Sequence, residues 1–234
     1  AIHQDAHFQG LNIQLQADCT QFDMKTPEGT FSVRMNLLGE FNVYNALAAT
    51  TALYTQGYTV PQILEQLEKI PPVKGRMEKL TSDLPISIFI DYAHTPDAIE
   101  KAISSVLPYK TQRLIFLVGT GGNRDRSKRP SMAEKASVAD YVILTTDDPR
   151  DEPYESILSD LKKGMLHDSY ACIGDREEAV KHAIAMAEPG DIIIFAGKGH
   201  EDYQIIGRKK YPHSDGDIAL VAGKLKFQDS PSRS

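Results

Sequence analysis

The stretch YVILTTDDPRDEP, residues 141–153, contains the pattern that decides the fold. Its first half is a run of apolar and β-branched residues, which is typical of a strand buried on both faces. Its second half changes abruptly to acids, a proline and an arginine, so the strand ends where Asp147, Asp148 and Arg150 begin. These side chains either cap the next helix or form a socket for a ligand that carries both positive and negative charge.

The same alternation of apolar runs and amphipathic segments continues on both sides of this stretch. It predicts further strands at 86–91, 113–120, 170–174 and 191–197, and helices at 96–107, 128–139, 154–166, 175–188 and 215–226. Near-continuous apolar strands that alternate with helices indicate an α/β fold with a doubly wound, mainly parallel sheet.

The N-terminal third has a different pattern. Residues 11–35 alternate apolar and polar positions around the turn signal TPEG, which predicts short antiparallel strands. A helix is predicted from GEFNVYNALAATTALYTQGY, with Gly57 at its C-terminal end, and a second one at about 61–69. Because IPPVKG then breaks regular structure, we predict two domains, residues 1–72 and residues 73–234.

Composition limits the possible partners. The chain has 234 residues, 41% hydrophobic and 25% charged, as in an ordinary globular protein. Its net charge of −6 argues against nucleic acid as the main partner. Two distant cysteines indicate a reducing compartment rather than a disulfide framework. No apolar run reaches the roughly 20 residues that cross a bilayer, so we expect a cytoplasmic protein without a membrane partner.

Every chemically dense segment follows a predicted strand. These segments are DYAHTPDA, GTGGNRDRSKRP, TTDDPRDEP and AGKGHEDYQ. The carboxyl ends of parallel strands meet at one edge of the sheet, where ligands of such folds bind. Glycines next to arginines and a lysine suit a carboxylate or a phosphate. The alternative is that polar loops simply follow apolar strands, but convergence of four such segments favours a binding site.

Two familiar nucleotide motifs are absent from the sequence. GTGGNRD lacks the spacing of a dinucleotide fingerprint, and Lys198 is followed by Gly199 rather than by the Ser or Thr of a P-loop. The seven histidines form no metal-binding spacing, so no metal-ligating residue is predicted.

Taken in order, GEFNVYNALAA, VKGRMEKL, DYAHTPDAIEKAI and the three later segments resemble the Mur ligases, specifically the MurE-type UDP-N-acetylmuramoyl-tripeptide synthetases. The resemblance implies a three-domain enzyme with a uridine-nucleotide domain, a central ATPase domain and a C-terminal α/β domain that binds an amino acid. Residues 1–72 would be a remnant of the central domain, preceding the C-terminal domain. The P-loop and the main Mg²⁺ ligands would lie upstream, so we expect the fragment to be inactive by itself.

The resemblance also implies an activity. The enzyme would be an ATP-dependent amide ligase that joins a diamino acid to UDP-MurNAc-L-Ala-D-Glu in peptidoglycan synthesis, with ATP and Mg²⁺ as cofactors. These two substrates would be its partners, and the sequence gives no evidence on oligomeric state. The competing interpretation is a non-catalytic α/β domain that binds a small molecule.

Individual roles carry over by position. Arg76 and Asp91 would be catalytic and would contact the phosphates and ribose of ATP, together with Asn42 and Asn45 from the preceding domain. Arg124 would bind a carboxylate of the amino acid. The remaining amino-acid residues would be Asp147, Asp148, Pro149 and Arg150, which stand at the family's D-N-P-R motif, and Gly197 and Glu201.

One departure from the family pattern affects the substrate. The family's Asn is Asp148 here, and a carboxylate accepts hydrogen bonds but cannot donate them. The amino acid is therefore either meso-diaminopimelate or L-lysine. Retention of Arg150 favours meso-diaminopimelate, because lysine has no distal carboxylate for the arginine to bind.

Overall fold

The computed structural model describes residues 1–80 and 82–228. Residues 229–234, which the sequence analysis assigned to the second domain, lie outside the described residues. The chain divides into two compact units. The first consists of Ala1–Val73 with Ser104–Tyr109, and the second consists of Lys74–Ile103 with the chain from Lys110 onward.

The first unit contains a small antiparallel sheet and two helices. Its strands are β1 (Gln9–Leu15), β2 (Thr20–Thr26) and β3 (Gly29–Met35), paired in that order, as predicted for residues 11–35. Helices α1 (Glu40–Thr55) and α2 (Val60–Leu67) bury Val43, Leu47 and Leu64 in a core shared with the sheet. Gly57 has a left-handed φ of 96° just beyond α1, where the sequence placed the end of the helix.

The second unit is built on a six-stranded sheet in the described part of the chain. Its strands are β4 (Glu78–Lys79), β5 (Ser87–Asp91), β6 (Leu114–Thr120), β7 (Tyr141–Thr146), β8 (Tyr170–Cys172) and β9 (Ile192–Ala196). The order is β4-β5-β9-β6-β7-β8, and only the short β4 pairs antiparallel with its neighbour among these strands. The predicted mainly parallel α/β sheet is confirmed.

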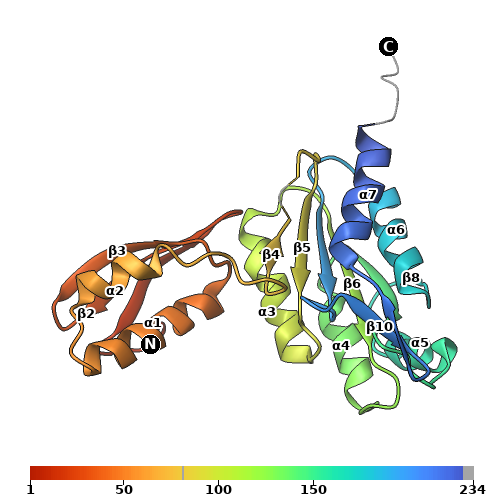
Figure 1. Cartoon of the computed structure of the whole chain (residues 1–234), viewed down its shortest axis with the longest axis horizontal. Coiled ribbons are helices and arrows are strands. Elements are labelled where there is room, and N and C mark those ends of the chain that lie inside the picture. Colours follow the sequence, from red (N-terminus) through yellow and green to blue (C-terminus); the bar gives the residue numbers. More distant parts are fainter. Residues whose placement is uncertain (81, 229–234) are drawn as a thin grey trace. The chain divides into compact units, whose positions relative to one another are not determined.

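Helices cover both faces of this sheet. They are α3 (Pro96–Val106, followed by a 3₁₀ turn at Leu107–Tyr109), α4 (Lys128–Ala136), α5 (Tyr154–Lys162), α6 (Arg176–Met186) and α7 (Asp215–Phe227). Helices α6 and α7 pack against Ile115, Leu117 and Phe195 on one face, and Figure 1 shows α3 and α4 on the other. Among the described residues, no helix is long and apolar enough to cross a membrane.

Several predicted boundaries were wrong. Helix α4 ends at Ala136 rather than at 139, because Ser137 caps it and turns its hydroxyl back to the carbonyl of Ala133. Helix α5 ends at Lys162 rather than at 166, shortly before Gly164. Strand β8 ends at Cys172 rather than at 174.

A hairpin between β9 and α7 was not predicted. It consists of β10 (Tyr203–Ile206) and β11 (Lys209–Pro212), with Gly207 at a left-handed φ of 60° in the turn. A Gly-Arg pair between two short runs is a weak hairpin signal, and the sequence analysis assigned no strand between 197 and 215. The hairpin matters because Arg150 forms a parallel bridge to Ile206.

The two-sided burial of the central strands gives a stability prediction. Leu117 on β6 is 0% exposed, whereas Leu225 on α7 is 61% exposed. We expect Leu117→Ala to lower the free energy of unfolding by about 2–5 kcal/mol because it removes buried contacts and leaves a cavity. Leu225→Ala, the matched control, is expected to change it by no more than about 0.5 kcal/mol. Urea unfolding followed by circular dichroism checks both, and equal losses would contradict the described core.

Candidate functional site

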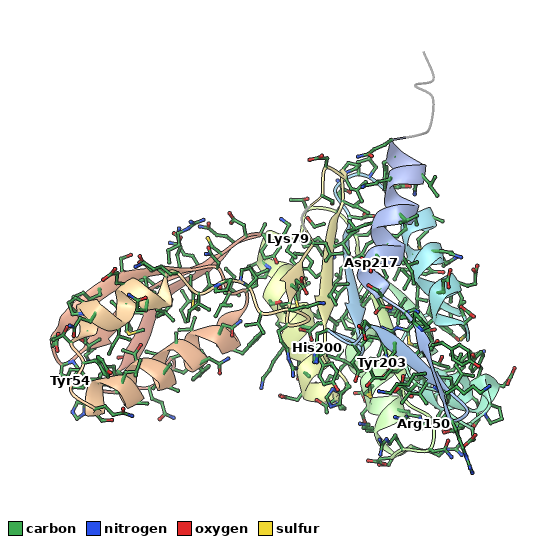
Figure 2. The ribbon with its side chains drawn as sticks, viewed as in Figure 1. Tyr54, Lys79, Arg150, His200, Tyr203 and Asp217 are labelled. Atoms are coloured by element: carbon green, nitrogen blue, oxygen red, sulfur yellow. The ribbon has the colours of Figure 1, made fainter. Side chains whose placement is uncertain are left out.

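The polar segments that follow β5, β6, β7 and β9 come together at the carboxyl edge of the sheet. They surround a cavity of about 570 Å³. In Figure 2, Arg150, Tyr203 and His200 come from these segments and from the hairpin. Six of the predicted residues line the cavity: Arg124, Asp147, Asp148, Arg150, Gly197 and Glu201. The other predicted residues of this unit, Pro149, Arg76 and Asp91, lie outside this lining.

A buried lysine joins the acids of the cavity. The Nζ atom of Lys198 lies 2.8 Å from Asp148 Oδ1, 2.9 Å from Glu201 Oε2 and 3.2 Å from Asp147 Oδ1. Its ammonium is also 5.1 Å from the centre of the Tyr203 ring. The Lys198 side chain is 1% exposed, so the chain itself supplies an ammonium for all three carboxylates.

The pKa values of Asp147 and Lys198 are both raised, but for different reasons. Burial raises the pKa of Asp147, although Arg176 and Lys198 oppose the shift. Burial would lower the pKa of Lys198, but Asp147, Asp148 and Glu201 outweigh it and the pKa is raised. The ammonium therefore stays charged at neutral pH.

The spacing of these carboxylates alone would suit a metal ion. Oxygens of Asp147, Asp148 and Glu201 lie within 4.8 Å of one another. However, the ammonium of Lys198 already lies between them at hydrogen-bonding distance. Two cations at one point would repel each other. These residues therefore do not fit a resident metal ion.

The loop of residues 147–150, called the DDPR loop, neutralises part of its own charge. Arg150 has a left-handed φ of 51°, which is strained for a residue with a side chain. Its guanidinium donates to the carbonyl oxygens of Gly122 and Asp148, both at 3.2 Å, and to Asp148 Oδ2 at 3.3 Å. Asp148 Oδ1 also accepts from the amide of Ile205 at 2.9 Å. Asp148 is thus turned toward partners within the chain.

The hairpin holds this strained loop in place. The Arg150 amide donates to the Ile205 carbonyl at 3.0 Å, and the Gly207 amide donates to the Arg150 carbonyl at 2.8 Å. Tyr203 and Ile205 of β10 also line the cavity. The hairpin is therefore part of the site, although the sequence analysis did not include it.

The glycine-rich segment contains arginines with different environments. Arg124 is exposed and lines the cavity. Arg129 is fully buried; its two terminal nitrogens each donate to an oxygen of Glu152 at 2.7 Å, and one donates to the Gly121 carbonyl at 3.1 Å. A Cβ on Gly122 would lie 1.8 Å from the Pro149 carbonyl oxygen, so this loop packs directly on the DDPR loop. Pro149 thus contacts the glycine-rich segment through its backbone.

Arg76 and Asp91 form a neighbouring arrangement at the end of β5. Asp91 is buried, and its oxygens accept from the amides of Met77 at 2.7 Å and Ala93 at 2.8 Å. Burial raises the pKa of Asp91, which these hydrogen bonds oppose. The exposed guanidinium of Arg76 lies 4.7 Å from the centre of the Tyr92 ring. Asp91 therefore fixes the backbone beside Arg76.

Asn42 and Asn45 lie on α1 in the first unit. Asn42 donates to the Leu38 carbonyl at 2.8 Å, and Asn45 donates to Asn42 Oδ1 at 3.0 Å. They belong to a different unit from the cavity residues.

Sequence reasoning missed Lys198 and Arg176. Lys198 was considered only as part of a P-loop, although a lysine between glycines at the end of a buried strand is a usable signal. Arg176 begins α6 and is fully buried; it donates to the carbonyls of Thr146 at 3.2 Å and Ala196 at 2.9 Å. Nothing in its local sequence distinguishes it from a surface arginine at a helix start.

Comparison with known families gives two matches along the chain. The glutamate ligase domain of Mur ligases matches residues 75–199, and the Mur ligase middle domain matches residues 1–53. The chain belongs to the Mur ligase family. The resemblance inferred from the motifs is thereby confirmed.

Curated relatives cover nearly the whole chain. UDP-N-acetylmuramyl-tripeptide synthetase 2 of Oceanobacillus iheyensis is 51% identical over 97% of this chain and 46% of its own length. The UDP-N-acetylmuramoyl-L-alanyl-D-glutamate–L-lysine ligase of Staphylococcus haemolyticus is 44% identical over 99% of this chain and 47% of its own length. The chain spans about half the length of these relatives.

Solved structures show the same fold. A UDP-N-acetylmuramoyl-L-alanyl-D-glutamate–2,6-diaminopimelate ligase has a TM-score of 0.68 and 34% identity, over 96% of this chain and 47% of that chain. A MurF ligase of Thermotoga maritima, solved in complex with ADP, has a TM-score of 0.68 at 15% identity, over 97% of this chain and 48% of that chain, which shows the fold alone.

The Arg129–Glu152 pair gives a pH-dependent prediction. Arg129 lowers the pKa of Glu152 from 4.5 to about 2. Glu152→Gln should therefore lower the stability by about 3 kcal/mol at neutral pH, because it removes the nearer of the two carboxylates that hold the buried guanidinium, and only Asp160 at 3.1 Å remains. The difference from wild type should persist above about pH 5 and disappear as the pH falls toward about 2, where Glu152 itself takes up a proton.

Acid-dependent chemical unfolding of both proteins checks this. Glu134→Gln, an exposed position on α4, is the control and should follow wild type at every pH. A stability difference for Glu152→Gln that is the same at pH 2 as at pH 7 would show that the carboxylate charge is not what holds the two loops together.

Proposed function

We propose that the chain forms the amino-acid site of an ATP-dependent ligase that adds a diamino acid to UDP-MurNAc-L-Ala-D-Glu, in the bacterial cytoplasm. The observation that carries the proposal is the cavity at the carboxyl edge of the sheet, which has an exposed arginine and a group of acids in its lining. An amino acid with a second ammonium group has charges that complement both. The names of the tripeptide synthetase and lysine ligase relatives support the reaction class.

The residues of the chain would act by binding and orienting substrates. Arg124 would pair with the α-carboxylate of the amino acid, since it is exposed at the cavity and free to form a two-pronged contact. Glu201 and Asp147 would receive the distal ammonium, while Gly197 permits close approach of the backbone. This arrangement would direct the remaining amine toward the acceptor.

The nucleotide would be contacted by other residues. Arg76 fits an anionic phosphate, because its guanidinium is exposed while Tyr92 supports its face. Asp91 would position Arg76 through the Met77 amide. Asn42 and Asn45 would contribute from the first unit. ATP would supply the phosphoryl group that activates a carboxyl group of the acceptor; no residue set described here fits Mg²⁺, so no step is assigned to that ion.

The amino acid itself has two candidates. The sequence favoured meso-diaminopimelate, and the presence of Arg150 in the cavity lining supports it. Two observations favour L-lysine. Arg150 is partly neutralised by Asp148 at 3.3 Å, and relatives of 43–44% identity are named as L-lysine ligases, compared with 34% for the diaminopimelate ligase structure.

Arg124 provides the test of the ligase proposal. In the full-length enzyme that contains this chain, Arg124→Ala should raise the KM for the amino acid at least about tenfold, because a charge-assisted contact contributes about 1.5–3 kcal/mol. The KM for ATP should change little. Phosphate release in the presence of UDP-MurNAc-L-Ala-D-Glu and each diamino acid is the measurement, with Arg34→Ala as an exposed control.

Two outcomes would contradict the proposal. Absence of amino-acid-dependent phosphate release with wild-type protein would favour the non-catalytic binding domain. An Arg124→Ala enzyme with an unchanged KM would remove this arginine from the carboxylate site.

Arg150 separates the two amino acids. Because its φ is left-handed, Asn is a better replacement than Ala, since Asn tolerates this conformation. If Arg150 binds the distal carboxylate, Arg150→Asn should lower kcat/KM for meso-diaminopimelate at least about tenfold and leave L-lysine nearly unchanged. A wild-type preference for L-lysine with a ratio that Arg150→Asn does not alter would select lysine and leave Arg150 as a partner of Asp148.

A further inference from the structure

The family resemblance assigns no role to Lys198, yet this residue lies at the centre of the acidic end of the cavity. Its side chain is 1% exposed, and its ammonium contacts three carboxylates at 2.8, 2.9 and 3.2 Å. The backbone on both sides is left-handed, with φ of 111° at Gly197 and 53° at Gly199. These glycines allow the chain to turn a lysine inward where β9 ends.

The charges around Lys198 do not cancel completely. The charged or titratable groups that face it or its carboxylate partners are Asp147, Asp148, Glu201, Arg150, Arg176, Tyr92 and Tyr203. Arg176 is paired with Asp215 at 2.7 Å, and burial raises the pKa of Tyr92, which favours its neutral form. Burial raises the pKa of Asp147, but the neighbouring ammonium of Lys198 favours its charged form. With all three carboxylates ionised, the cations of Lys198 and Arg150 leave one net negative charge.

We propose that Lys198 is a specificity-determining residue that sets the charge of this end of the cavity at one net negative. The inference rests on the proposed function, since it takes the ligand to be an amino acid. One negative charge complements a ligand side chain that carries one ammonium group. With Lys198 neutral, two negative charges would remain, and the three carboxylates within 4.8 Å would repel one another.

Loss of the lysine charge has a measurable consequence. Carboxylates that lie close together without a counter-ion repel one another. Uptake of a proton by one of them relieves part of this repulsion. In Lys198→Met, one of the three should therefore titrate at least about one pH unit higher than in wild type. Adding Asp148→Asn to this variant removes one negative charge and should return the titration of the other two to its wild-type position.

The preference for a ligand with a distal ammonium group should depend on the same net charge of the cavity end. L-Norleucine is a probe with the shape of L-lysine and no distal ammonium. The ratio of its Kd to that of L-lysine should be independent of pH in wild type between about pH 5.5 and 8.5, since lysine stays protonated there. In Lys198→Met the ratio should increase about tenfold as the pH rises over this range, because the extra carboxylate ionises. In the single variant Asp148→Asn, the ratio of the L-norleucine Kd to the L-lysine Kd should fall below that of wild type.

Both measurements use the 234-residue chain. Carboxyl ¹³C NMR titration reports the three carboxylates, and calorimetry with L-lysine and L-norleucine reports the preference. Lys181→Met is the control, because Lys181 also bridges two carboxylates, Glu177 and Glu178, but at an exposed position on α6. Asp148→Asn keeps the test decisive if Lys198→Met does not fold.

The outcomes separate this inference from the proposed function. Unchanged carboxylate titrations in Lys198→Met, or equal loss of both ligands without pH dependence, would overturn it and make Lys198 a packing residue. If Lys198→Met does not fold, the inference is overturned when Asp148→Asn has the same ratio of the L-norleucine Kd to the L-lysine Kd as wild type. Shifted titrations with no amino-acid binding by any variant would support the charge-setting role and contradict the proposed amino-acid site.

Discussion

The buried guanidinium of Arg176 is the interaction on which the arrangement of the second unit depends. It donates to the carbonyl of Thr146 at the end of β7 and to that of Ala196 at the end of β9, and its charge is met by Asp215 at the start of α7. His213 Nε2 donates to the same carboxylate at 2.7 Å. Burial would lower the pKa of Arg176, but Asp215 outweighs it and the pKa is raised. An unpaired buried charge is very costly, so the start of α7 has to lie beneath the two strand ends.

This anchoring explains why the neighbouring loops carry so much charge without loss of order. The DDPR loop begins directly after Thr146, and the GKGHE segment begins directly after Ala196. Their strand ends are held by one residue, so Asp147, Asp148 and Lys198 are placed next to one another by the sheet rather than by the loops. The charges of these three residues then compensate locally, whereas Arg124 and Arg76 stay exposed.

The sequence was sufficient for the sheet and for the convergence of its loops. Two-sided burial leaves a nearly continuous apolar run in β6, β7 and β9, and a parallel sheet dictates that their polar segments meet at one edge. The pairing of individual charges was not accessible. Lys198 and Asp148 are separated by 50 positions in the chain, and Arg176 and Asp215 by 39, and no local pattern shows which acid meets which base. The sequence interpretation assigned the charges of the DDPR loop to the amino acid and did not show that Asp148 also has three partners within the chain.

The hairpin extends this argument from side chains to backbone. Residue 150 keeps a left-handed φ because the Ile205 carbonyl and the Gly207 amide hold its peptide groups from both sides. A strained conformation persists only where its surroundings impose it. The direction of the Arg150 side chain is therefore set by β10, which also provides Tyr203 beneath the Lys198 ammonium and Ile205 at the cavity wall. Under the proposed function, amino-acid selection would depend on the hairpin as much as on the residue types of the motif, since Arg150 could reach a ligand only as far as its hydrogen bonds to Asp148 and Gly122 permit.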